Sequence, residues 1–312
     1  MALLAGLFVV GGLIGWFVRN PSDGGERTTR IRSPQHQTHL ESQIEKLESE
    51  VDSARRGASN SGVSSSPHSS AAKSPDPSDP PGVSAGKRLA GVTVVVDPGH
   101  NGGNASHPEE IDRPVVSAAD GTTKPCNTTG TETNDGALTE AEFNFEVSVD
   151  LKRDLHELGA TVVMTRDSNT GIGPCVNERA EIANRAGASA AISIHADGND
   201  ADGAHGFDVI HASPDEMVEP ALAEPSLVLA ERVRDALVSA GVPPANYVGH
   251  DGLDSRSDLG GLNLARVPAV LVELGNMRSA EEAAQMETSR YRARLAQALV
   301  AGVADFLEEA QS

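Results

Sequence analysis

The 312-residue sequence is poor in aromatic residues, in cysteine and in basic residues. It contains one Trp, two Tyr and six Phe. Its two cysteines are too few for a scaffold built on disulfides, and they are not spaced as CxxC, which argues against a structural zinc finger. It has 25 basic and 45 acidic side chains, for a net charge of −20. Because so acidic a chain repels phosphate groups, we expect no nucleic acid partner.

The negative charge is confined to the C-terminal part of the chain. Residues 1–87 carry 9 basic and 9 acidic side chains, so the whole net charge of −20 belongs to residues 88–312. This change of composition predicts a domain boundary near residue 88. The part that follows is long enough to bury a core of its own.

Residues 2–18 form an apolar run without charges. A helix of this length is at the short end of what crosses a bilayer. A cleaved signal peptide and a buried core helix are the alternatives, although no basic residue precedes the run and no clear cleavage site follows it. We expect residues 1–19 to be a transmembrane anchor or a signal peptide. Several arginines follow the run, and they leave its topology open because positive charges favour the cytoplasmic side.

Two segments connect this run to the acidic part. Residues 20–56 predict a short helical stalk, because four apolar residues have the spacing of a coiled-coil seam: Leu40, Ile44, Leu47 and Val51. The seam spans fewer than three heptads, so a solvated helix and a weak dimer contact through residues 40–51 both stay open. Residues 57–87 are rich in Ser and Pro and predict a disordered linker.

Residues 88–312 alternate between β-branched runs and amphipathic stretches. The predicted strands cover residues 92–96, 160–165, 190–194, 207–210 and 269–272. The predicted helices cover residues 139–158, 176–185, 226–240 and 280–307. Strands that are apolar on both faces are typical of buried, mostly parallel sheets. We therefore predict an α/β fold, with a mostly parallel twisted sheet covered by helices on both faces.

Three polar residues follow the apolar runs of predicted strands: His195 and Glu273 directly, and His100 after Asp97-Pro98-Gly99. The carboxyl ends of parallel strands share one edge of a sheet, where ligands bind, so we expect these side chains to converge. Two imidazoles and a carboxylate are typical of catalytic zinc with an open fourth position. The pattern does not decide whether Glu273, Glu140 or Glu142 completes the ligand set.

The motifs in residues 90–308 resemble those of the zinc-dependent N-acetylmuramoyl-L-alanine amidases of the type-3 fold. The resemblance is carried by D-P-G-H at residues 97–100, E-x-x-x-N at 140–144, R-x-x-x-A-N at 179–184, S-x-H-A at 193–196 and P-A-V-L-V-E-x-G at 268–275. The long polar segment 101–135 and the sequence Glu273-Leu274-Gly275-Asn276-Met277 are most similar to the mycobacterial and actinobacterial branch.

The resemblance implies a metal site and a reaction. His100, Glu140 and His195 would hold one zinc ion, and Glu273 would be the catalytic carboxylate. Glu140 is preferred to Glu142 because the family's Asn follows it four residues later. The substrate would be peptidoglycan or muropeptide fragments, cleaved between N-acetylmuramic acid and the L-alanine of the stem peptide. The location would be the bacterial cell envelope, outside the cytoplasm, with the protein membrane-anchored or secreted.

Two other functions stay open at this point. One is a non-catalytic module that binds peptidoglycan, and the other is a zinc peptidase that cuts within stem peptides. The chain also departs from many family members directly after Gly275, where they carry Phe, so the local substrate wall is expected to differ.

The resemblance to exported enzymes also bears on the two cysteines. In such a domain Cys126 and Cys175 are expected to form a disulfide, two free thiols being the alternative. Closing a loop of about 49 residues would stabilise the fold by roughly 3–5 kcal/mol.

Overall fold

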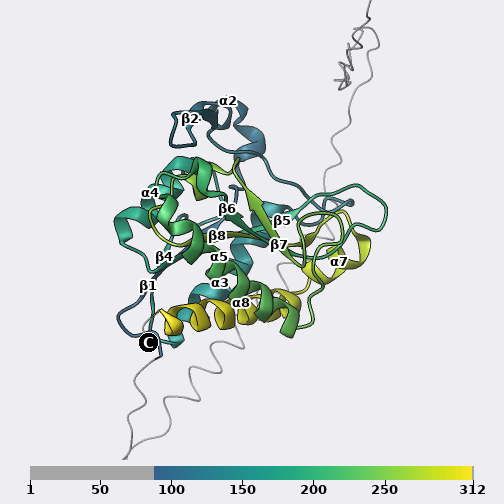
Figure 1. The fold of residues 1–312 in the computed structure, drawn as a ribbon. Helices are drawn as coiled ribbons and strands as arrows, with labels where there is room; N and C mark the ends of the chain where they lie inside the picture. Colours follow the sequence, from purple (N-terminus) through teal and green to yellow (C-terminus); the bar gives the residue numbers. More distant parts are fainter. Residues whose placement is uncertain (1–87, 311–312) are drawn as a thin grey trace, which may run out of the picture. The chain divides into compact units, whose positions relative to one another are not determined.

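The computed structural model describes residues 88–310, which form an α/β unit around a six-stranded sheet (Figure 1). The predicted anchor, stalk, linker and dimer contact fall in residues 1–87 and lie outside the described residues. Within residues 88–310, no helix combines the length and the hydropathy that a membrane span requires.

The sheet has the strand order β4-β1-β5-β8-β6-β7. Its strands are β1 (Thr93–Pro98), β4 (Thr161–Met164), β5 (Ala190–Asp197), β6 (Asp208–Ala212), β7 (Leu253–Arg256) and β8 (Ala269–Asn276). The pairs β4–β1, β1–β5, β5–β8 and β6–β7 are parallel, as predicted for most of the sheet, whereas β6 runs antiparallel to β8. The reversal of β6 brings its first residue to the edge where β8 ends.

Helices cover both faces of the sheet, as predicted. The helices α3 (Glu140–Glu157), α5 (Ala223–Ser239) and α8 (Ser289–Glu309) pack together on one face and enclose the main core. On the other face lie α4 (Val176–Ala186) and the short α6 (Gly260–Asn263). Strand β1 illustrates the division, since Val94 and Val96 belong to the main core while Val95 packs with Ala183 of α4.

Several elements were not predicted. They are η1 (Asn104–Ser106), α2 (Pro108–Ile111), the hairpin β2 (Pro114–Val116) and β3 (Thr123–Pro125), η2 (Pro214–Glu216), η3 (Pro220–Leu222), β7 and α6. All of them have only three or four residues, too few to show a periodic pattern. The predicted helix over residues 280–307 is in fact two helices, α7 (Ala280–Met286) and α8, because the side chain of Thr288 accepts a hydrogen bond from the Tyr291 N–H and starts a new helix.

A disulfide joins Cys126 to Cys175. Cys126 directly follows β3, and Cys175 is the residue before α4. The pair is buried against Val115 of the hairpin. The bond therefore fastens the segment after residue 126, which includes Thr128 and Thr131, to the start of α4.

Candidate metal centre

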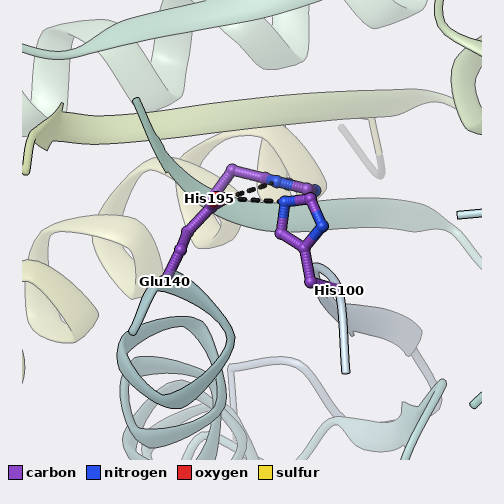
Figure 2. A group of neighbouring side chains, drawn as sticks. All are labelled: His100, Glu140 and His195. Carbon is purple, nitrogen blue, oxygen red and sulfur yellow. Dashed lines mark hydrogen bonds and ion pairs between the residues drawn. The ribbon is translucent and has the colours of Figure 1, made fainter. Parts of the chain in front are cut away.

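His100, Glu140 and His195 converge on one point (Figure 2). One carboxylate oxygen, Oε1 of Glu140, lies 2.9 Å from Nε2 of His100 and 2.9 Å from Nδ1 of His195. The three ligand atoms all lie within 4.8 Å of one another. Among residues 88–310 this is the one group of three or more His, Cys, Asp or Glu side chains with such a geometry.

His100 is held in an unusual backbone conformation at the end of β1. Its φ of 56° lies in the left-handed region, which residues other than glycine seldom adopt. Its Nδ1 donates a hydrogen bond to the carbonyl of Thr128 at 3.0 Å, which orients the ring so that Nε2 points at the cluster. Gly99 before it is required by packing, because a Cβ there would overlap the imidazole of His195.

Glu140 is the first residue of α3 and is only 4% exposed. The start of the helix is fixed because the Thr139 side chain accepts a hydrogen bond from the backbone N–H of Glu142. Oε2 of Glu140 accepts a hydrogen bond from the Thr131 N–H at 2.9 Å, so the carboxylate is aimed by the segment that the disulfide fastens. Glu142 is exposed and outside the cluster, so the geometry selects Glu140.

The charge of Glu140 is stabilised by the two imidazoles. Burial alone would raise the pKa of Glu140, but the neighbouring His100 and His195 outweigh burial and hold that pKa well below its usual range. For the same reason the pKa of His100 is raised despite its burial. Burial dominates for His195, and its pKa is lowered.

Glu273 lies beside the cluster and is not part of it. It is paired in register with His195 across β5 and β8. Its Oε2 is buried and receives no hydrogen bond from any described residue. Burial, followed by the negative charges of Glu140 and Asp208, raises the pKa of Glu273 well above its usual value. The structure thus supplies a carboxyl with a free oxygen next to three converging ligands.

Asp208 was missed by the sequence analysis. It is the first residue of β6 and pairs in register with Glu273 of β8. It is 1% exposed, its Oδ1 has no hydrogen-bond partner among the described residues, and burial together with Asp254 and Asp197 raises its pKa to about 7. The connection between β5 and β6 has no helical pattern and is shorter than the crossover that joins two parallel strands. This length was the sequence signal that β6 runs antiparallel.

A buried ion pair supports the turn that carries His100. Arg179 on α4 contacts Asp97 at 2.6 Å and donates to the carbonyls of Pro98 at 2.7 Å and His100 at 2.8 Å. Asp97 also accepts hydrogen bonds from the hydroxyl groups of Thr165 and Ser193. Burial alone would raise the pKa of Asp97, but these contacts lower it to about 2. Arg179 and Asp97 are therefore scaffold for the turn that carries His100.

The donor set fits a zinc ion. Two imidazole nitrogens and one carboxylate oxygen are the protein ligands of many catalytic zinc sites, which keep a further position open. Two of the three candidate ligands are also oriented by a neighbouring group, as zinc ligands commonly are: His100 by the Thr128 carbonyl, and Glu140 by the Thr131 N–H.

Comparisons with known proteins agree with this geometry. A family model described as N-acetylmuramoyl-L-alanine amidase matches residues 94–305. The N-acetylmuramoyl-L-alanine amidase Rv3717 of Mycobacterium tuberculosis is 44% identical over 219 residues, which are 70% of this chain and 88% of that protein.

Two crystal structures of mycobacterial N-acetylmuramyl-L-alanine amidases named Ami1 match the fold. The protein from Mycobacterium smegmatis gives a TM-score of 0.66 at 41% identity, over 71% of this chain and 99% of the other. The apo protein from Mycobacterium abscessus gives a TM-score of 0.66 at 44% identity, over 70% of this chain and 100% of the other. With the family model covering most of residues 88–310, the chain belongs to the N-acetylmuramoyl-L-alanine amidase family of hydrolases.

Proposed function

We propose that the protein is a zinc-dependent peptidoglycan hydrolase that cleaves the amide bond between N-acetylmuramic acid and the L-alanine of the stem peptide. The observation that carries the proposal is the contact of Glu140 Oε1 with both His100 and His195, beside a carboxyl that is free to exchange a proton. The names of the mycobacterial relatives support the choice of amide bond.

His100, Glu140 and His195 would hold the metal ion. Zinc bound there supplies a Lewis acid that polarises the amide carbonyl and lowers the pKa of water toward neutrality. Two features of the chain prepare the site for it. Glu140 is ionised through its low pKa, and the hydrogen bond from Nδ1 to Thr128 turns Nε2 of His100 toward the cluster.

Glu273 is the proposed general base and general acid. Its free Oε2 takes a proton from the attacking water and then gives that proton to the leaving nitrogen of L-alanine. A carboxyl transfers protons in both directions most effectively when its pKa is close to the working pH. The burial and the neighbouring carboxylates that raise the pKa of Glu273 move it in that direction.

The proposed function implies a location in the cell envelope and disfavours a non-catalytic binding module. Peptidoglycan and its muropeptide fragments lie in the cell envelope, and a disulfide is typical of a protein outside the cytoplasm. The N-terminal anchor or signal peptide stays a prediction consistent with that location. A non-catalytic module is not favoured, because binding alone does not require a buried carboxyl beside a metal-binding cluster.

The test is product analysis on a defined muropeptide with purified full-length protein. Mass spectrometry should find a free lactyl end on the muramic acid and a free L-alanine amino group on the peptide. Cleavage between amino acids would instead support the peptidase. Glu273→Gln should bind zinc normally and lose hydrolysis by about 10²–10⁴-fold. Glu142→Gln, two residues after Glu140 on α3 and exposed, is the matched control and should keep its activity.

A further inference from the structure

Arg166 donates hydrogen bonds to five different oxygens although it lies outside all the motifs described above. It follows the edge strand β4 and is 6% exposed. Its acceptors are the carbonyls of Pro98 at 2.9 Å, Gly99 at 3.2 Å, Ala141 at 2.6 Å and Ser168 at 2.9 Å, and Oδ1 of Asn169 at 3.0 Å. A guanidinium has five N–H groups in a fixed plane, and all five N–H groups of Arg166 donate a hydrogen bond.

Two of these acceptors adjoin proposed metal ligands. Gly99 immediately precedes His100, and Ala141 immediately follows Glu140. The same nitrogen, Nη2 of Arg166, donates to both carbonyls. One planar group therefore links the end of β1 to the start of α3, the two segments that present His100 and Glu140 to each other.

The buried position of Arg166 is energetically unfavourable for a charged side chain. The nearby carboxylate of Asp97 is taken by Arg179 at 2.6 Å, and Arg166 forms no ion pair with any described residue. Its charge faces neutral oxygens and the ring of Phe145, 5.0 Å away on α3. Burying a charge without an ion pair costs free energy unless hydrogen bonds compensate it. A lysine could not replace this group, because an ammonium has three donors and no planar fork.

We propose that Arg166 is a positioning residue that fixes the separation of His100 and Glu140 and thereby sets the zinc affinity of the cluster. The proposal rests on the metal site of the proposed function. His100 occupies a left-handed conformation, which is costly for histidine and persists only where neighbours hold it. Without the link through Arg166, the turn at Gly99 moves relative to α3, and the contact between His100 Nε2 and Glu140 Oε1 lengthens.

The first experiment measures zinc affinity by competition with a chromophoric chelator, on the full-length protein and on Arg166→Lys and Arg166→Gln. Loss of groups that orient metal ligands typically costs about 10–100-fold in affinity, and that loss is expected for both variants, with no rescue by Lys. The visible spectrum of the Co²⁺-loaded variants should also change, because the ligand geometry is altered.

The matched control is Arg292→Gln. Arg292 is also a largely buried arginine that binds a backbone carbonyl, at Met286, and it contacts Glu146 at 2.7 Å, away from the cluster. Its loss should lower the melting temperature and leave the zinc affinity unchanged. If the Arg166 variants behave in this way, Arg166 is only structural and the proposal is overturned.

Two further measurements keep the proposal testable if those variants do not fold. Asn169→Ala removes one of the five acceptors without touching the ligand segments, and it should weaken zinc binding a few-fold; an unchanged affinity contradicts the proposal. A crystal structure of the metal-free Asn169→Ala protein should show a longer contact between His100 and Glu140 than 2.9 Å. Wild-type protein that binds no zinc would contradict the proposed function, while this structural comparison would still decide the role of Arg166.

Discussion

Asp208 and Glu273 lie directly opposite each other in the antiparallel pair of β6 and β8. Both carboxyls are buried, and each has an oxygen without a hydrogen-bond partner among the described residues. When it ionises, Asp208 adds negative charge next to the proposed general base, and this charge is among the causes that raise the pKa of Glu273. The antiparallel direction of β6 therefore influences the pKa of the proposed general base, Glu273.

The raised pKa of Asp208 predicts a pH-dependent stability. Its pKa is about 7 in the folded protein, against 3.8 for an ordinary aspartate. The contribution of the protonated group is fully present below pH 3.8 and is lost as the pH rises through about 7. Asp208→Asn, which cannot ionise, should therefore gain stability over the wild type between pH 5 and pH 8, on the order of 3 kcal/mol.

Urea unfolding of the metal-free proteins at pH 5 and pH 8, followed by circular dichroism, measures this gain. The exposed Asp202→Asn is the matched control for the exchange of Asp for Asn. Equal effects of Asp208→Asn at pH 5 and pH 8 would show that Asp208 is not held in its protonated form.

Gly99→Ala should damage the metal site without removing a ligand. A Cβ at this position would overlap the imidazole of His195, so the ring must move away from Glu140. We expect zinc affinity to fall by at least about tenfold, as for other changes that misorient a ligand. Gly261→Ala on α6 is the control, because its Cβ would meet nothing closer than 3.9 Å. Isothermal titration with zinc distinguishes the two, and equal affinities would contradict the packing argument.

The disulfide should matter both to stability and to the metal site. Replacing Cys126 and Cys175 together by Ser should destabilise the fold by about 3–5 kcal/mol, because the bond closes a loop with a sequence separation of 49. It should also weaken zinc binding, since the carbonyl of Thr128 and the N–H of Thr131 follow Cys126 closely and orient His100 and Glu140. Thermal unfolding and chelator competition measure the two effects, and a variant that loses stability with zinc affinity intact would separate the disulfide from the site.

The sequence predicted the parts of the site that depend on strand ends. The apolar runs before His100, His195 and Glu273 are parallel strands, and the carboxyl ends of parallel strands meet at one edge. The choice of Glu140 over Glu142 needed the resemblance to a family, because both glutamates open the same helix.

Other parts could not be predicted from patterns of side chains. The antiparallel direction of β6 places Asp208 beside Glu273, and a short apolar run carries no information about its direction. Arg166 acts on backbone carbonyls, which every residue possesses, so no motif identifies its acceptors. The hairpin of β2 and β3 is too short for a periodic signal, although it directly precedes the cysteine that fastens the segment beside the cluster.

The central claim is that one zinc ion held by His100, Glu140 and His195 is required for amide hydrolysis. The most direct measurement is the rate at which a defined muropeptide releases peptide with a free L-alanine amino group, as zinc is added back to metal-free, full-length protein. The account predicts no hydrolysis without zinc and a rate that rises linearly and levels off at about one zinc per chain. Full hydrolysis by the metal-free protein, or a rate that His195→Ala leaves unchanged, would contradict it.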